Sequence, residues 1–529
     1  MRQMLIIIPI LLINISPFTT GFKFLGLFPL PIRSNFLMYE TIFKGLADRG
    51  HEIDVLSHYP QKTPVKNIND IDISGSIPSL DNNVSIESVS KMTRIESAWS
   101  VFRTHGVDVC EKVLQHRALQ ILRKSKKKYD GILIEVFGTD CLLGFSHLYK
   151  APVIGITSSM HLPWADERMG NPDNPSYVSN YFIPFNKNMT IGQKIELATA
   201  TVLSKIGYHL ISTIPSEMRA RDFFGTDLPP LDQLAFNMSL LLVNSYFGLS
   251  DPRPTVPGLI EVGGLHIQNP KNLTPELATL AKSANGIIYF SMGTVVKLSS
   301  FDNQKLQSLL HVLSQLPYTV LFKGNVQDLR SFKPTDNIHF SEWFPQIDIL
   351  CHSKTKLFIT PGGQMSIQEA AFCGVPIVGI PFLPHQVLNV QFFESKGAGI
   401  GIEYDDIDEF KIKRAIKTIT DNNTYHKNAK ALARVYNDRP LSPLQTALFW
   451  IEYVIRHKGA FHLRTKSVDL IWMDYYLLDV AFIFTIIFIV LLYLMVKLLH
   501  FLQDYFDYSK LQIKSNGKVS THNNVKATQ

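Results

Sequence analysis

The feature that most constrains the fold is a pair of glycines between an apolar strand and a helix. The run Lys356–Thr360 has the length and apolarity of a strand, and Gly362–Gly363 then allows a tight turn of the backbone. Ser366–Cys373 has a helical composition, and Val375–Pro381 is apolar on consecutive residues, as in a parallel strand buried on both faces. This pattern predicts a strand–turn–helix–strand unit of a doubly wound α/β domain.

The same turn is a candidate anion site. The first turn of a helix has free backbone N–H groups, and both these groups and the helix dipole favour a phosphate. Glu369 lies one turn further on, where a carboxylate could accept hydrogen bonds from two sugar hydroxyls. A glycine turn before a helix is a weak signal by itself, and a doubly wound domain that binds no nucleotide is the alternative.

The longer stretch Trp343–Gln386 is far more specific. It resembles the signature of the UDP-glycosyltransferases, WxPQ…FITHGG…S…E…G.P.vgiPff.DQ, in the form found in membrane-bound insect enzymes. Pro361 stands where that family usually has His, and His385 where it usually has Asp. The matching residues are Trp343, Pro345, Gln346, Thr360, Gly362, Gly363, Ser366, Glu369, Gly374, Pro376, Pro381 and Gln386.

The resemblance implies a donor site for a UDP-sugar. In the family, the indole of the WxPQ segment stacks on uracil, its Gln bonds the base, and the glycine turn holds the diphosphate. Residues after the strand Gly286–Gly293 also contact the diphosphate in that family. The implied donor-binding residues are Ser291, Gly293, Thr294, Trp343, Gln346, Gly362, Gly363, Ser366, Glu369, His385 and Gln386. The family uses the UDP-sugar as a co-substrate and needs no cofactor or metal, and no metal cluster is readable in the sequence.

A second βαβ unit begins the chain after its leader. Phe22–Leu30 and Glu52–Ser57 read as strands, with a helix over Phe36–Asp48 between them. The family carries its catalytic His in the loop after the first of these strands, and Asn35 occupies that position here. An amide cannot accept a proton near neutral pH.

Asp140 matches the family's acidic partner of the catalytic His. It follows the predicted strand Tyr129–Phe137, at the edge of the sheet where ligands bind. The alternative reading is a helix N-cap for the segment that starts at Cys141. The segment before this strand, Glu96–Leu122, is predicted to be one helix.

Length and composition fit a large membrane-associated protein. The chain has 529 residues, of which 46% are hydrophobic and 18% charged, with a net charge of +7. The positive excess is diffuse, which argues against nucleic acid as a partner. Four cysteines are scattered without a C-x-x-C pair, so neither a zinc site nor a disulfide scaffold is predicted.

The termini carry targeting signals. Residues 1–21 have the charged start, apolar core and small-residue end of a secretory signal peptide. An uncharged stretch within 475–499 is long enough to span a membrane, and 500–529 would form a cytosolic tail. This predicts a type I protein with its large domain in the lumen, and the resemblance places it in the endoplasmic reticulum membrane. The glycosylation sequons begin at Asn83, Asn188, Asn237, Asn272 and Asn422.

The predicted organisation is that of a GT-B glycosyltransferase, with two doubly wound Rossmann-like domains and one C-terminal transmembrane helix. The predicted segments are a signal peptide over 1–21, an acceptor-binding domain over 22–250, a linker over 251–283, a UDP-sugar domain over 284–440, a return helix and juxtamembrane segment over 441–470, a transmembrane helix over 475–499 and a tail over 500–529.

Two functions from different classes remain open at this stage. The first is an inverting transfer of a hexose, glucose in the insect-like relatives, to a small lipophilic acceptor, as in detoxification; a homo-oligomer is compatible with this function. The second is a membrane-anchored protein that binds a nucleotide sugar or a lipophile without turnover, because Asn35, Pro361 and His385 all depart from the family. An NAD-linked dehydrogenase is disfavoured, since the first βαβ unit lacks G-x-G-x-x-G.

Overall fold

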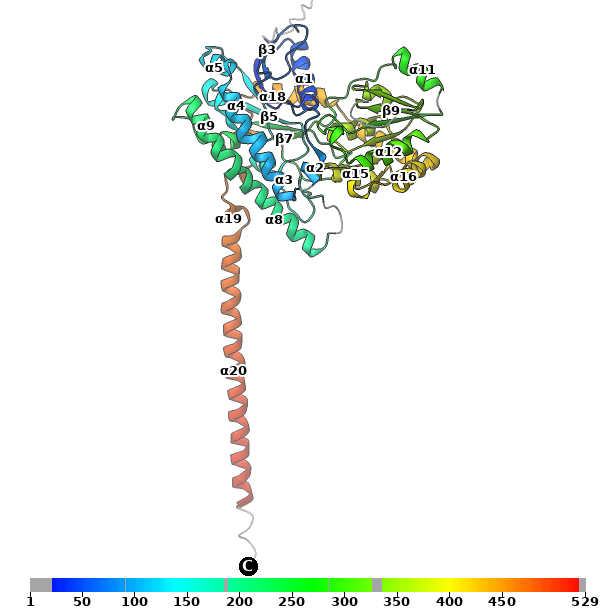
Figure 1. The fold of residues 1–529 in the computed structure, drawn as a ribbon. Coiled ribbons are helices and arrows are strands. Elements are labelled where there is room, and N and C mark those ends of the chain that lie inside the picture. Colours follow the sequence, from blue (N-terminus) through cyan, green and yellow to red (C-terminus); the bar gives the residue numbers. More distant parts are fainter. Residues whose placement is uncertain (1–20, 91, 185–188, 284, 326–334, 523–529) are drawn as a thin grey trace, which may run out of the picture. The chain divides into compact units, whose positions relative to one another are not determined.

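A computed structural model describes residues 21–90, 92–184, 189–283, 285–325 and 335–522 (Figure 1). The predicted signal peptide and the sequon at Asn188 therefore lie outside the described residues, apart from residue 21 of the former. The chain forms two compact units, residues 1–465 and 466–529, and each is considered separately.

The first unit contains a seven-stranded parallel sheet in the order β3-β2-β1-β4-β5-β6-β7. Its strands are β1 (Lys23–Leu27), β2 (Glu52–Ser57), β3 (Ile68–Asp72), β4 (Gly131–Glu135), β5 (Val153–Thr157), β6 (Leu240–Val243) and β7 (Leu259–Glu261). In β4, Ile132 and Ile134 pack into one apolar cluster and Leu133 packs into another. Alternate residues thus bury both faces of the sheet, which explains the continuous apolar runs in the sequence.

The same unit contains a six-stranded parallel sheet in the order β10-β9-β8-β11-β12-β13. Its strands are β8 (Ile287–Ser291), β9 (Thr319–Lys323), β10 (Ile338–Ser341), β11 (Thr355–Thr360), β12 (Ile377–Gly379) and β13 (Gly399–Gly401). Helix α14 (Gln364–Cys373) connects β11 to β12, as the glycine-pair motif predicts. Two doubly wound sheets were predicted from the sequence, whereas β3, β6, β7 and β13 were not predicted.

The remaining helices of this unit connect and cover the two sheets (Figure 1). Before β8 they are α1 (Arg33–Asp48), α2 (Ile86–Ser90), α3 (Arg94–Val101), η1 (Phe102–Val107), α4 (Asp108–Gln115), α5 (Arg117–Lys124), η2 (Cys141–Leu143), α6 (Gly144–Tyr149), α7 (Pro163–Arg168), α8 (Ile191–Gly207), η3 (Tyr208–Thr213), α9 (Ile214–Phe224), α10 (Leu231–Phe236) and α11 (Pro275–Ser283). After β8 they are η4 (Leu298–Ser300), α12 (Asn303–Ser314), α13 (Gln346–Leu350), α15 (Pro384–Ser395), η6 (Tyr404–Asp406), α16 (Glu409–Asp421), α17 (Asn423–Asn437), α18 (Pro443–Arg456) and η7 (Phe461–Leu463).

Helix α1 begins three residues earlier than predicted, at Arg33, so that Ser34 and Asn35 belong to its first turn rather than to a loop. The residue before the helix, Ile32, offers no side-chain cap. The backbone N–H of Arg33 instead donates to the carboxylate of Asp81, at 3.1 and 3.3 Å. A free N–H of the first turn is thus satisfied by a residue 48 positions away, which a local pattern cannot show.

The predicted helix over Glu96–Leu122 is interrupted twice. A π-helical turn, η1, separates α3 from α4, and His116 takes an extended conformation before α5. Gly106 in this turn packs tightly on the loop after β4, where an added Cβ would lie 2.7 Å from the carbonyl oxygen of Gly138. This contact brings one helical turn close to the edge of the sheet.

Cys351 and Cys373 form a disulfide that the sequence analysis did not predict. The two residues are 22 positions apart, without the short spacing of a recognisable motif, and their Cα atoms lie 4.6 Å apart because α13 and α14 are neighbours. Cys110 and Cys141 are free and buried.

Helix α18 returns the chain to the first sheet. Its buried residues Leu448 and Ile451 belong to the apolar cluster that contains Phe36 and Phe43 of α1. Gly45 of α1 allows the close approach, since an added Cβ would lie 3.0 Å from the methyl groups of Leu444 and Leu448.

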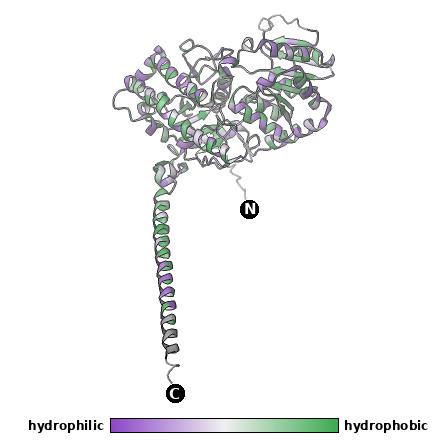
Figure 2. Cartoon of the chain, turned by 60° about the horizontal axis from the view of Figure 1, so that its bottom comes forward, coloured by the Kyte–Doolittle hydropathy of each residue, from purple (hydrophilic) through white to green (hydrophobic). Residues whose placement is uncertain are grey.

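The second unit contains η8 (Lys466–Asp469), α19 (Trp472–Tyr475) and the long helix α20 (Leu478–His522). Residues Leu478–Ile513 are long and apolar enough to cross a membrane by length and composition. Figure 2 shows the apolar residues concentrated in the first part of α20 and hydrophilic residues further along it. The helix predicted over 475–499 therefore begins at Leu478 and continues past residue 499.

Candidate active site

A cavity of about 540 Å³ lies within the first unit, lined by residues from both sheets' connections. We name its residues between 32 and 182 the N-terminal wall and those between 266 and 386 the C-terminal wall. The predicted site residues that line it are Asn35, Gly293, Thr294, Trp343, Gln346, Gly363, Ser366, Glu369, His385 and Gln386. Ser291, Gly362 and Asp140 are not among its lining residues.

The glycine turn presents open backbone to the cavity. Gly362 has φ +86°, a conformation that favours glycine, and an added Cβ there would lie 2.9 Å from the carbonyl oxygen of Gln386. At Gly363, in contrast, an added Cβ would meet nothing within 4 Å. Gly363 is also the N-cap of α14 and provides no side chain to bond its first N–H groups. The turn therefore leaves room for an anion close to the backbone, which the predicted donor site requires.

Trp343 is 57% exposed, so its indole is available to a ligand rather than packed in the core. The ammonium group of Lys323 lies 4.4 Å from the centre of its ring and donates to the carbonyl of Gly293 at 3.3 Å. Burial lowers the pKa of Lys323. The indole thus offers a flat surface at the cavity, beside a cation from the end of β9.

Glu369 and Gln346 face each other across the C-terminal wall. The Gln346 amide donates to the Glu369 carboxylate at 2.6 Å and to the Ser366 hydroxyl at 3.2 Å. Burial raises the pKa of Glu369 to about 7, against the opposing effects of Gln346 and the Lys323 charge. His266 lies 3.6 Å from the other carboxylate oxygen, and burial lowers its pKa to about 4. Near pH 7 the Glu369 carboxyl is therefore partly protonated, and a ligand that donates hydrogen bonds to it would favour the ionised form.

The end of the motif has a more structural role than predicted. The Gln386 side-chain oxygen accepts hydrogen bonds from the N–H groups of Phe382 and Leu383, at 2.9 and 3.0 Å, and so fixes the turn before α15. His385 stacks on Tyr181 of the N-terminal wall, with ring centres 4.8 Å apart. Burial lowers the pKa of His385 to about 4, so the imidazole is neutral near pH 7.

Thr294 and Ser291 extend this wall from the end of β8. The Thr294 hydroxyl bonds the hydroxyl of Ser34 in α1 at 3.2 Å, which joins the two walls. Ser291 is buried, and its hydroxyl accepts a hydrogen bond from the N–H of Gly293 at 3.3 Å. Gly293 has φ +83°, so this loop also depends on glycine.

Asp140 lies apart from the cavity and has other partners. It is buried and forms an ion pair with Arg168 of α7, and the Tyr208 hydroxyl donates to the same carboxylate oxygen at 2.9 Å. Its side chain does not cap η2 either. The prediction that Asp140 would stand beside Asn35 therefore requires correction, because a guanidinium that is distant in the sequence already balances its charge.

A second carboxylate near the start of α1, besides Asp81, is Glu135, which was not predicted from the sequence. It accepts hydrogen bonds from the Tyr39 hydroxyl at 2.9 Å and the Leu30 N–H at 3.2 Å, and these two residues flank Asn35 in the chain. Burial raises the pKa of Glu135 to about 7. A charged residue at the carboxyl end of an otherwise apolar strand is the signal that could have identified it.

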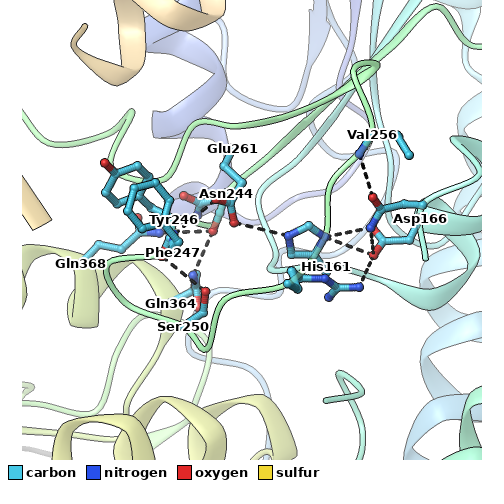
Figure 3. Close-up of polar contacts among 12 residues, drawn as sticks. His161, Asp166, Asn244, Tyr246, Phe247, Ser250, Val256, Glu261, Gln364 and Gln368 are labelled. Atoms are coloured by element: carbon cyan, nitrogen blue, oxygen red, sulfur yellow. Dashed lines mark hydrogen bonds and ion pairs between the residues drawn. The ribbon is translucent and has the colours of Figure 1, made fainter. Parts of the chain in front are cut away.

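A polar network holds α14 against the first sheet, and it too was missed (Figure 3). The amide groups of Gln364 and Gln368 donate to the carbonyl of Asn244, at 2.9 and 3.2 Å. The Asn244 side chain donates to the carbonyl of Ser158, a residue of the N-terminal wall, at 2.7 Å. The helix that carries Glu369 is thereby placed relative to the N-terminal wall.

Next to this network lies a buried charge cluster (Figure 3). The His161 imidazole lies 3.0 Å from Asp166 and 3.5 Å from Glu261, and Arg253 donates to Asp166 at 2.7 Å. Within the part of the chain that the structure describes, no group of His, Cys, Asp and Glu residues could hold a metal ion.

Comparison with known proteins supports the chemistry of this site. A family model described as "UDP-glucoronosyl and UDP-glucosyl transferase" matches residues 30–512. UDP-glucosyltransferase 2 of Dactylopius coccus is 36% identical over 477 residues, which cover 87% of this chain and 89% of that protein. UDP-glucuronosyltransferase 2B30 of Macaca fascicularis is 28% identical over 488 residues, covering 86% and 90%.

Solved structures agree on the fold. The glycosyltransferase of kitacinnamycin superposes with a TM-score of 0.54 at 14% identity, covering 82% of this chain and 99% of that one. The calicheamicin glycosyltransferase CalG4 gives a TM-score of 0.51 at 14% identity, covering 83% and 99%. The architecture is GT-B, and the chain belongs to the family of UDP-glucuronosyl and UDP-glucosyl transferases, enzymes that transfer a sugar from a UDP-sugar to an acceptor.

Proposed function

We propose that this enzyme transfers glucose from UDP-glucose to a small lipophilic acceptor, with inversion at the anomeric carbon. The observation that best supports this proposal is that one cavity is lined by two walls of different chemistry. The C-terminal wall combines an exposed indole, the Gln346–Glu369 pair and an open glycine turn. Glucose is the sugar named in the relative from Dactylopius coccus.

The roles proposed for the C-terminal wall follow from its contacts. The Trp343 ring stacks on uracil, and Gln346 bonds the base. Glu369 accepts hydrogen bonds from the ribose hydroxyls, and these bonds replace part of the solvation of the carboxylate. The N–H groups that begin α14, together with Thr294 and Ser366, hold the diphosphate and stabilise the charge that develops as UDP leaves.

The N-terminal wall combines apolar side chains with several serines, Asn35 and His105, and its apolar part suits a lipophilic acceptor. Its apolar residues are Ile32, Leu37, Leu80, Val84, Val89, Met92, Val101, Phe137, Met160 and Phe182. In an inverting transfer the acceptor oxygen attacks from the face opposite the departing diphosphate, so donor and acceptor must occupy opposite walls of one cavity. In this proposal the C-terminal wall holds the donor and the N-terminal wall holds the acceptor.

A direct assay tests this proposal. Purified enzyme is incubated with UDP-glucose and a panel of phenols, alcohols, thiols and amines, and both UDP release and the glucosylated product are measured. We expect UDP release that depends on an acceptor, with apolar phenols among the best substrates. Binding of UDP-glucose without release for any acceptor would show a binding protein instead, and absence of binding would refute the site itself.

We also propose that the large unit lies in the lumen of the endoplasmic reticulum, anchored by α20 as a type I membrane protein. The apolar span Leu478–Ile513 supports an anchor, and the Cys351–Cys373 disulfide supports an oxidising compartment. The sequon residues Asn83, Asn237, Asn272 and Asn422 are exposed, so each is accessible to glycosylation. In this proposal residues 22–250 form the acceptor domain, 251–283 the linker and 284–440 the donor domain.

Protease protection tests this topology. Protease added outside sealed microsomes should remove only the segment after Lys497 and leave the large unit intact. Degradation of the large unit under the same conditions would contradict luminal placement, whereas a fully protected tail would contradict a single span.

A further inference from the structure

His105 is the one histidine of the N-terminal wall, within the described residues, that lines the cavity. It belongs to η1, the π-helical turn that interrupts the predicted long helix. The residues of this helical run that line the cavity are Ser97, Ser100, Val101, Thr104 and His105. Their spacing is that of a single helical face, so His105 faces the same space as the apolar residues of the wall.

The turn is fixed at the edge of the sheet where α1 also begins. The His105 ring contacts Phe137 edge-on, with ring centres 5.7 Å apart, and Phe137 follows β4 by two residues. Strand β4 pairs directly with β1, with Leu27 opposite Ile134. Neighbouring strands lie about 4.8 Å apart, so the segment that leads from β1 into α1 and the segment after β4 that supports His105 leave the sheet side by side.

Hydrogen bonding defines which ring nitrogen can accept a proton. The Thr104 hydroxyl donates its single proton to the carbonyl of Ser100 at 2.7 Å, because that carbonyl can only accept. The Thr104 oxygen lies 2.9 Å from Nδ1 of His105, so Nδ1 carries a hydrogen and donates it to this oxygen. Nε2 of the neutral ring then holds the free lone pair.

We propose that His105 is the general base of the reaction, in place of the histidine that Asn35 has replaced. This inference rests on the proposed function. As the acceptor oxygen bonds to the anomeric carbon of the donor, its proton passes to Nε2 of His105. The bond from that carbon to the diphosphate oxygen breaks, and its electron pair leaves with UDP. The imidazolium then returns the proton to solvent.

The surroundings of the ring keep it neutral before the reaction. Burial lowers the pKa of His105 to about 4, so the imidazole is neutral and its lone pair is available at physiological pH. The Val101 carbonyl and the Asp108 carboxylate oppose that shift, and both favour the imidazolium once the proton has arrived. Thr104 is a positioning residue, since it acts through the ring.

The test compares acceptors that need a base with one that does not. His105→Gln should lower kcat for aliphatic alcohols by about 10²–10⁴-fold, the usual value of general-base assistance. Transfer to p-nitrophenolate, which arrives already ionised, should change less than about threefold for the same reason. Adding Asn35→His to this variant should restore alcohol turnover. Thr104→Val should give a smaller loss with alcohols only, and Thr104→Ser should behave as the original enzyme.

Controls separate chemistry from folding. UDP affinity by calorimetry and thermal melting should match those of the original enzyme, and the same change at a buried histidine outside the cavity, His58→Gln, should leave alcohol turnover unchanged. Equal losses for alcohols and nitrophenolate, or no loss for either, would overturn the role of His105 alone. Absence of any transfer by the original enzyme would overturn the proposed function first, and this inference with it.

Discussion

The two walls of the cavity differ in the distance over which their polar groups are assembled. In the C-terminal wall, Trp343, Gln346, Gly363 and Glu369 come from one stretch of the chain, and Thr294 and Lys323 join them from the ends of β8 and β9. In the N-terminal wall, Asn35 belongs to α1 while His105 belongs to a separate helical run. A donor whose structure does not vary can be bound mainly by one continuous motif. An acceptor site formed by distant segments can change one residue at a time.

This difference explains why the two walls tolerate amino-acid substitutions differently. The nucleoside part of the donor is the same in every reaction cycle, so its contacts must be retained together. Proton removal from the acceptor requires only one lone pair at the correct place, and more than one segment of the N-terminal wall can supply it. Loss of the histidine at Asn35 therefore alters the acceptor side, whereas Trp343, Gln346 and Glu369 on the donor side keep the residues of the motif.

The largest expected effect is on stability, at Asp140. Asp140→Asn removes the partner of the buried Arg168 guanidinium, and we expect the free energy of unfolding to fall by about 3–5 kcal/mol. Chemical denaturation measures this loss. The folded fraction should still bind UDP normally, because Asp140 does not line the cavity. Unchanged stability combined with lost transfer would return Asp140 to the catalytic role predicted from the sequence.

The next largest expected effect is on UDP affinity, and it tests the C-terminal wall. Glu369→Ala removes the carboxylate proposed to hold the ribose, and we expect UDP affinity to fall by about 10²-fold, since a hydrogen bond to a charged group contributes about 1.5–3 kcal/mol. Isothermal calorimetry measures the affinity, with Glu403→Ala as the control because Glu403 lies outside the cavity. Wild-type affinity in the Glu369 variant would show that the donor binds elsewhere.

A smaller effect is expected on the turnover of alcohols, and it tests the N-terminal wall. Asn35→His should raise turnover of alcohols by up to about tenfold in the otherwise unchanged enzyme, while amines, which need no base, should gain less. Glu135 is the carboxylate next to this position, so the gain should disappear in Asn35→His/Glu135→Gln. Retention of the gain in that double variant would mean that the new imidazole acts without Glu135.

The smallest effect is a pH dependence of donor binding. Because the folded pKa of Glu369 is raised to about 7, the carboxyl is largely protonated below that pH and cannot accept two hydroxyls. UDP-glucose affinity should therefore rise by about tenfold from about pH 6 to about pH 8, and Glu369→Gln should abolish this rise. UDP-glucose is preferred to UDP as the probe because its diphosphate does not titrate in this range. A flat profile in the original enzyme would contradict an ionised Glu369 in the complex.

The raised pKa also affects stability, with a definite sign. The folded state retains a proton on Glu369 that the unfolded state has released between about pH 4.5 and about pH 7. The folded state binds more protons in this range, so the contribution of Glu369 to the free energy of unfolding falls as pH rises. The ligand-free enzyme should therefore lose some stability towards neutral pH, and bound donor should offset the loss.

The sequence by itself determined the two doubly wound sheets, the glycine turn before α14 and the apolar C-terminal helix, and most of the residues it predicted to bind the donor line one cavity. These features are local, because strand length, glycine position and helix composition act within a few residues of each other. Asn35 was also identified from a local motif as a departure from the family, and it lines the cavity.

Only the tertiary structure decided the partners of these residues. In the folded chain Asp140 forms an ion pair with Arg168, and Glu135 accepts hydrogen bonds from Leu30 and Tyr39. Cys351 forms a disulfide with Cys373, and His105 lines the cavity. Each of these outcomes depends on contacts between segments that are distant in the chain. A buried charge takes the nearest group that can balance it, and sequence spacing does not reveal which group that is.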